Sequence, residues 1–316
     1  MNRTPTRNLL ILHTPTAQAL SDWVEVKDRI EARAPDIEVR IASNLARNSV
    51  TRRWQVSRPS LVFSPSPLLE YQPAGGRVYA GRHLHELAKD EELRRLTQAG
   101  LPVPATIRLT PDLRLIGEPW SEYVVVKPTT GWSGKMVRLV RTEDLPRRYT
   151  ELSRDGRVQM LVQPYIDHVD AEGRPGTYRV TTLFGHEIWV AYMYRPVPRP
   201  LLGEIAADPA GIIAVNDRSH ARIMTFCREE NLIALARSAF RAFPEIPVLG
   251  IDIIRETATG RLFLMECNPS GNVWHFSSDR AREVTTPEYR RGMYEQFNLL
   301  DRTADLLIEK TRAEAV

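Results

Sequence analysis

The stretch LGIDIIRETATGRLFLMECNPSGN, residues 249–272, decides how this chain is interpreted. Its two apolar runs, LGIDII and LFLMEC, predict two strands, and Thr257–Gly260 predicts the tight turn between them. A hairpin folded about this turn places Asp252 directly opposite Glu266, and directly opposed residues share a face of the sheet. Asn268 lies two residues beyond Glu266 and shares the same face, because side chains alternate along a strand.

Asp252, Glu266 and Asn268 together predict a metal site. Two carboxylates and an amide oxygen suit Mg²⁺ or Mn²⁺, whereas they suit zinc poorly. The alternative is a surface hairpin whose polar side chains face water. We favour the metal site, because the two strands are too apolar for an exposed hairpin and acidic groups within them need a partner that offsets the cost of burial.

Composition and charge narrow the class of protein. The chain has 316 residues, of which 42% are hydrophobic and 26% charged, as expected for a soluble globular protein of one to three domains. Arginine supplies most of the positive charge behind the net charge of +4, and the arginines are scattered along the chain. They fit small phosphate or carboxylate ligands at least as well as nucleic acid, which more often binds a dense basic patch, and charge alone does not decide between the two. No apolar run is long enough to cross a membrane. The two cysteines, Cys227 and Cys267, predict no disulfide framework, so we expect a cytoplasmic protein.

The first part of the chain predicts a small open α/β domain. Its predicted strands span 8–13, 36–42 and 60–63. Residues 16–34 carry apolar side chains at helical spacing, and a helix between such strands is typical of an α/β layer. A second helix is predicted over 83–99, because Gly100 followed by Leu-Pro-Val-Pro is a stop signal.

The segment YVVVKPTTGWSGKMVRLV, residues 123–140, predicts a loop that can close over phosphates. Two β-rich arms flank Gly131, Ser133 and Gly134, and free backbone N–H groups in such a loop bind anions. Lys127 ends the first arm and supplies a point charge. The spacing matches neither a Walker loop nor the G-x-G-x-x-G fingerprint, and an ordinary turn is the alternative.

Two arginines follow in a predicted hairpin. Residues 158–166 predict a strand, after which TYRVTTLF and EIWVAYMYR flank Gly185-His186, a strong hairpin signal. Arg179 lies in the first arm and Arg195 at the end of the second. A buried arginine is costly unless it meets an anion, so we expect one of the two to do so.

The rest of the chain predicts antiparallel strands covered by helices. Helical spacing predicts helices over 229–243 and 287–310. From residue 110 onward the pattern is that of an α+β layer. Residues 270–275 directly follow the predicted metal strand, and we expect them to form a substrate loop.

Taken in order, these features resemble the ATP-grasp superfamily. They are most similar to carboxylate–amine ligases of the glutathione synthetase and ribosomal-protein glutamate ligase (RimK-like) type. The resemblance covers residues 80–275. It is carried by three segments in the same order, AKDEELRRLTQAGLPVPAT, VVVKPTTGWSGK and GIDIIRETATGRLFLMECNPSG.

The resemblance implies a fold and a division into domains. An α/β N-terminal domain at 1–85 would precede an α+β ATP-grasp fold in which two β-sheet subdomains sandwich ATP. The central subdomain, with the glycine-rich lid, would span 86–163. The C-terminal subdomain, with the metal site, would span 164–316.

The resemblance also implies a role for each matching residue. Phosphate contacts would come from Lys89, Lys127 and Arg179. The lid would contain Gly131, Ser133 and Gly134. The hinge that holds adenine would consist of Gln163, Tyr165 and Ile166. One or two Mg²⁺ or Mn²⁺ ions would be held by Asp252, Glu266 and Asn268. Arg195 would orient the substrate carboxylate.

The implied activity is an ATP-dependent ligation. A carboxylate is activated as an acyl phosphate and joined to an amine, with release of ADP and phosphate. The substrates would be small molecules or peptides, without nucleic acid or a membrane, and a homo-oligomer is compatible with this activity. Two alternatives remain open, namely an ATP-grasp kinase that makes a stable phosphate ester and a non-catalytic ATP-binding module.

Overall fold

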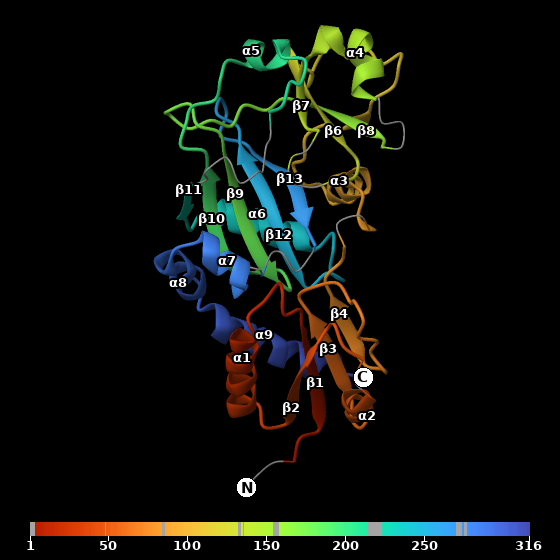
Figure 1. Ribbon diagram of the computed structural model, residues 1–316, viewed down its shortest axis with the longest axis vertical. Coiled ribbons are helices and arrows are strands. Elements are labelled where there is room, and N and C mark those ends of the chain that lie inside the picture. The colour runs from red at the N-terminus through yellow and green to blue at the C-terminus, as the bar shows by residue number, and fades with distance from the viewer. Residues whose placement is uncertain are drawn as a thin grey trace.

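Three β-sheets follow one another along the long axis of the molecule (Figure 1). The structure is a computed structural model and describes residues 4–47, 49–83, 86–131, 134, 136–153, 158–213, 223–269, 274 and 277–316. The mixed α/β architecture predicted from the sequence is confirmed. The proposed domain boundaries after residues 85 and 163 stay predictions.

A parallel sheet forms one end of the molecule. Its strands in spatial order are β2 (Ile37–Ser43), β1 (Arg7–His13), β3 (Ser60–Ser64) and β4 (Arg77–Ala80). The connecting helices are α1 (Leu20–Arg33) and α2 (Ser49–Gln55). The three predicted strands are confirmed, and α2 and β4 are additional. α1 begins at Leu20 and not at Thr16, because the side chain of Gln18 accepts the N–H of Thr14 at 2.8 Å and closes a turn before the helix.

The C-terminal helix returns to this first sheet. α8 (Pro287–Glu295) and α9 (Leu299–Glu314) are separated at Asn298, whose φ of 50° is left-handed. The prediction of a single helix over 287–310 is therefore wrong. Asparagine tolerates the left-handed region better than most residues do, and the left-handed Asn298 interrupts the helix here. α9 packs against α1, and the backbones of Val316 and Ser60 exchange hydrogen bonds of 2.9 and 3.3 Å.

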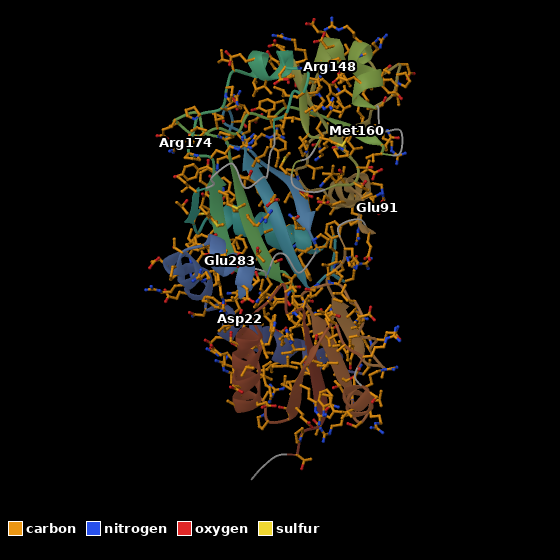
Figure 2. All side chains as sticks on the ribbon, viewed as in Figure 1. Asp22, Glu91, Arg148, Met160, Arg174 and Glu283 are labelled. Atoms are coloured by element: carbon orange, nitrogen blue, oxygen red, sulfur yellow. The ribbon has the colours of Figure 1, made fainter. Side chains whose placement is uncertain are left out.

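A buried acidic residue joins the first layer to the middle of the molecule. Asp22 lies on α1 at the end that faces the middle sheet (Figure 2). Its carboxylate accepts the hydroxyl of Tyr294 at 2.9 Å and the indole N–H of Trp274 at 3.4 Å. Burial raises the pKa of Asp22, although these hydrogen bonds act in the opposite direction. α1 is thereby tied both to α8 and to the segment that follows the predicted metal strand.

The middle sheet is antiparallel and holds most of the predicted site. Its strands in spatial order are β11 (Ile223–Phe226), β10 (His186–Tyr194), β9 (Gly176–Leu183), β12 (Val248–Arg255) and β13 (Leu262–Asn268). One face is covered by α6 (Glu230–Phe240), which packs on Val180 and Ile251. The turn between β9 and β10 consists of Phe184 and Gly185, one residue earlier than predicted. Both have positive φ (49° and 81°), as a type I′ hairpin requires.

The register of β12 and β13 confirms the predicted pairing. Asp252 lies opposite Glu266, and Gly250 lies opposite Asn268. A bulge follows directly, because Ile253 pairs with Leu264. On the other side of β12, Asp252 lies opposite Arg179 of β9. These side chains point away from α6.

A smaller antiparallel sheet forms the other end. Its strands in spatial order are β5 (Ile107–Arg108), β8 (Met160–Pro164), β6 (Tyr123–Pro128) and β7 (Arg138–Arg141). The two β-rich arms predicted around the glycine loop are β6 and β7. α3 (Lys89–Gln98) contacts the edge strand β13, and it begins at Lys89 and not at His83 as predicted.

Short helices complete the fold. They are a 3₁₀ helix (Thr142–Asp144), α4 (Leu145–Leu152), α5 (Leu202–Ala207) and α7 (Asp279–Val284). α5 packs on β7 at the end of the molecule. Within the described ranges, no helix has the length and apolar character needed to cross a membrane.

Candidate active site

Each predicted carboxylate ligand of the metal is bound by a cation. The guanidinium of Arg179 holds both carboxylate oxygens of Asp252, with Nε–Oδ1 at 2.7 Å and Nη2–Oδ2 at 2.6 Å. Burial acts to lower the pKa of Arg179, but Asp252 outweighs it and the pKa is raised. Lys89, at the start of α3, forms an ion pair with Glu266. The buried-strand arginine therefore meets an anion, as predicted, and in this structure the anion is Asp252.

Asn268 completes the predicted metal set. Its side-chain nitrogen lies 3.3 Å from Oδ2 of Asp252 and 3.2 Å from the carbonyl oxygen of Gly250. The three oxygen-bearing side chains thus lie within one patch of the sheet, and their chemistry fits a hard divalent cation. Within the described part of the chain, no three His, Cys, Asp or Glu side chains form a metal cluster, and this set has only two carboxylates.

Lys127 is a buried cation beside this patch. It is the penultimate residue of β6 and is 8% exposed, and no hydrogen bond or ion pair joins its ammonium group to another residue that the structure describes. Burial and the nearby charge of Lys89 lower the pKa of Lys127 to about 8, while Glu266 and Glu92 oppose the shift. A buried ammonium group of this kind fits an anionic ligand.

Glu92 is a site residue that the sequence did not single out. It lies on α3, is 3% exposed, and accepts the backbone N–H of Cys267. Burial and the charge of Glu266 raise the pKa of Glu92 to about 8. Helix glutamates are usually solvated, and only its i+3 spacing from Lys89 points to the same face of α3.

The start of the glycine loop borders the same patch. A small cavity is lined by Leu87, Lys89, Glu92, Thr129, Thr130, Gly131, Glu266, Cys267 and Pro269. The N–H of Lys89 donates to the carbonyl of Thr129 at 2.8 Å, which joins α3 to the loop. Gly131 and Gly134 have positive φ (141° and 67°). Ser133 lies outside the described residues, as do Trp132 and Lys135.

The predicted adenine hinge lies at the end of β8. Gln163 is buried and donates to Oγ1 of Thr106 at 2.7 Å. The N–H of Tyr165 donates to the carbonyl of Tyr123 at 3.0 Å. Ile166 accepts at its carbonyl from Nδ1 of His168 at 2.8 Å, a contact that no sequence pattern indicated. The three hinge residues therefore lie together, on the smaller sheet and the loop that leaves it.

Arg195 lies farther from this patch along its strand. It follows β10, in which Ala191 pairs with Arg179, so it lies roughly 13 Å along the strand from that pair. Its backbone N–H donates to the carbonyl of Pro175 at 3.3 Å. Its role at the substrate stays a prediction. Of the predicted substrate loop 270–275, only Trp274 is described.

Comparison with solved structures identifies the fold. No protein-family model matches the sequence, and no curated protein matches it significantly. D-cycloserine synthetase DcsG is similar in structure, with a TM-score of 0.53 and 16% identity over 95% of this chain and 99% of DcsG. ATP-grasp ligase PsnB, solved with a minimal precursor, has a TM-score of 0.54 and 15% identity over 96% of this chain and 99% of PsnB. The chain therefore has the fold of the ATP-grasp ligases.

Proposed function

We propose that the protein is an ATP-dependent ligase that activates a carboxylate as an acyl phosphate and joins it to an amine. The observation that carries the proposal is the set of cations around the predicted metal face. Lys89 pairs with Glu266 and Arg179 pairs with Asp252. Lys127 is buried near Glu266, and its ammonium group forms no hydrogen bond or ion pair with another described residue. Phosphoryl transfer between anions requires this concentration of positive charge.

The residues of the site have distinct tasks in this proposal. Lys127 binds the triphosphate, and Lys89 and Arg179 move from their carboxylates onto phosphate oxygens when the nucleotide binds. Asp252, Glu266 and Asn268 would then hold one or two Mg²⁺ ions, which would neutralise charge on the phosphate groups. In support, PsnB has been solved with Mg and ADP.

Other residues of the site orient the adenine and the substrate carboxylate and keep water away from the phosphates. Gln163, Tyr165 and Ile166 hold the adenine at the hinge, and the loop with Gly131, Ser133 and Gly134 closes over the phosphates. Closure excludes water, which would hydrolyse an acyl phosphate. Arg195 orients the carboxylate that is activated.

The substrates belong to one of two classes in this proposal. DcsG is described as a D-cycloserine synthetase, and PsnB has been solved with the precursor peptide PsnA2. A small-molecule or a peptide carboxylate therefore suits this chain, and we propose a ligation of the RimK-like type. We propose that the reaction takes place in the cytoplasm.

ADP release tests the proposal. Purified protein with ATP and Mg²⁺ is incubated with a panel of carboxylates and amines, including peptides, and hydroxylamine is added in parallel. We expect ADP release that depends on a carboxylate, together with a hydroxamate that traps the acyl phosphate. ADP without a hydroxamate would favour the kinase. Tight nucleotide binding with no ADP under any pairing would favour the non-catalytic module.

A further inference from the structure

Glu92 lies where the helix α3 meets the edge of the middle sheet. It is three residues after Lys89 on α3, so both side chains lie on the same side of the helix. Lys89 reaches Glu266, whereas Glu92 is 3% exposed and reaches the backbone of Cys267. The two helix residues therefore contact two successive positions of β13.

The contact with Cys267 falls between two predicted metal ligands. β13 is the last strand of its sheet, so backbone N–H groups on its outer side have no neighbouring strand. At Cys267 the carboxylate of Glu92 replaces the missing acceptor, and this N–H lies between Glu266 and Asn268. A buried N–H without an acceptor is costly, so this bond holds the strand in place.

The charged groups around Glu92 offer a second reason for an acidic residue at this position. Lys89, Lys127 and Glu266 all interact electrostatically with its carboxylate. A buried acidic group can thus act either as a hydrogen-bond acceptor for the strand or as a counter-charge for the lysines. The direct contact in the structure is with the strand, since Glu92 forms no ion pair with another described residue.

We infer that Glu92 is a positioning residue that fixes the backbone of β13, and with it Glu266 and Asn268, for metal binding. The inference rests on the proposed function, because it takes these two residues as metal ligands. In this inference Glu92 acts through the backbone N–H of Cys267, which its side chain contacts directly.

Two substitutions separate the hydrogen bond from the charge. Glu92→Gln keeps an oxygen acceptor at the same reach and removes the ionisable carboxyl group. Glu92→Asp keeps the ionisable carboxyl group and withdraws the acceptor by about 1.5 Å, the length of one C–C bond. The control is the neighbouring residue Glu91, whose side chain is 45% exposed and pairs with Arg94 on the outer side of α3 (Figure 2). Glu91→Gln and Glu91→Asp make the same chemical changes away from the strand.

Two measurements test the inference. The first is hydrogen exchange at the Cys267 amide in the metal-free protein. The second is Mn²⁺ affinity, measured by electron paramagnetic resonance with a non-hydrolysable ATP analogue. For Glu92→Asp we expect exchange to be faster and Mn²⁺ affinity weaker, each by about tenfold, the size expected when a buried hydrogen bond is lost. Glu92→Gln and both Glu91 variants should stay within about threefold of the wild type.

The outcomes are distinct. Wild-type Mn²⁺ affinity in Glu92→Asp, or a loss in Glu92→Gln as large as that in Glu92→Asp, overturns the inference. If the wild-type protein binds no Mn²⁺ with the analogue, both the inference and the proposed function are overturned. Mn²⁺ binding that is the same in all variants overturns the inference alone. Unchanged exchange at Cys267 in Glu92→Asp also overturns it, without reference to nucleotide.

Discussion

Arg179 and Asp252 lie directly opposite each other on neighbouring strands, and the guanidinium holds both carboxylate oxygens at 2.6 and 2.7 Å. Their side chains are 26% and 16% exposed, so the pair is largely shielded from water. The second pair, between Lys89 and Glu266, is bound through a single carboxylate oxygen, and its glutamate is 33% exposed. The two predicted carboxylate ligands of the metal therefore differ in how much each contributes to the ligand-free fold.

This difference predicts unequal effects of removing each charge. Asp252→Asn should lower the free energy of unfolding of the ligand-free protein by about 2 kcal/mol, because it leaves a buried arginine with a weakened partner. Glu266→Gln should change it by less than about 1 kcal/mol, since partly exposed ion pairs contribute little. Thermal melting of the nucleotide-free variants measures both.

The same two variants should behave alike once nucleotide is added. A non-hydrolysable ATP analogue with Mg²⁺ should raise the melting temperature of the wild-type protein, because ligand binds only the folded state. Both variants should lose most of this increase. A collapsed ligand-free fold in Glu266→Gln would contradict the prediction and show that Glu266 is a structural residue.

Local patterns predicted the parts of the site that lie within one strand or one hairpin. The turn at Thr257–Gly260 sets the register of β12 and β13, and the register sets the shared face of Asp252 and Glu266. Lys127 could be placed in the same way, because it ends a β-rich run before a glycine loop.

Contacts between distant segments could not be predicted in this way. The partner of Arg179 depends on β9 pairing with β12, which are more than 60 residues apart in the chain. Glu92 has the pattern of a solvated helix residue, and only the docking of α3 on the edge of β13 brings its side chain to the N–H of Cys267. The return of α9 to the first sheet depends on a left-handed Asn298, which no periodicity in the sequence indicates.

The first sheet and the segment that directly follows β13 approach each other closely at Gly81. A Cβ atom at this position would lie 2.6 Å from the carbonyl oxygen of Pro65 and 3.0 Å from that of Pro269, directly after β13. Gly81→Ala should therefore lower the free energy of unfolding by about 1–3 kcal/mol. Chemical denaturation measures this change, and nucleotide-dependent stabilisation should weaken with it.

Gly75 provides the matched control for this substitution. It lies in the same layer, and an added Cβ would have its nearest contact at 3.5 Å, with a methyl group of Val56. Gly75→Ala should therefore keep wild-type stability to within about 0.5 kcal/mol. Equal effects of the two substitutions would show that the close approach at Gly81 is not the cause.

Because His168 is buried, we expect the protein to lose stability in acid. Its Nδ1 lies 2.8 Å from the carbonyl oxygen of Ile166, and burial lowers the pKa of His168 below its usual value. A histidine with a lowered pKa in the folded state takes up a proton more readily when unfolded. Its contribution to stability is therefore fully present above about pH 6.5 and is lost as the pH falls through the folded-state pKa.

Melting temperatures measured between pH 8 and pH 5 test whether stability falls as the pH falls. The wild-type protein should lose stability below about pH 6.5, and His168→Gln should show a shallower loss over the same range. The slope should not vanish, because burial also lowers the pKa values of His13 and His186. An equally steep loss in His168→Gln would assign the acid sensitivity to other groups.

Lys127 should show opposite effects on stability and on nucleotide binding. Its buried ammonium group has no direct partner among the described residues, so Lys127→Met should leave the ligand-free protein unchanged or stabilise it by about 1 kcal/mol. Nucleotide affinity should fall by at least about tenfold, because a charge-assisted hydrogen bond to phosphate is lost. Melting temperature and calorimetric binding of an ATP analogue with Mg²⁺ measure the two effects.

Lys310→Met is the control, since Lys310 pairs with Glu314 at 2.7 Å on α9. A destabilised Lys127→Met protein that still binds nucleotide at wild-type affinity would show that Lys127 supports the fold and not the phosphates.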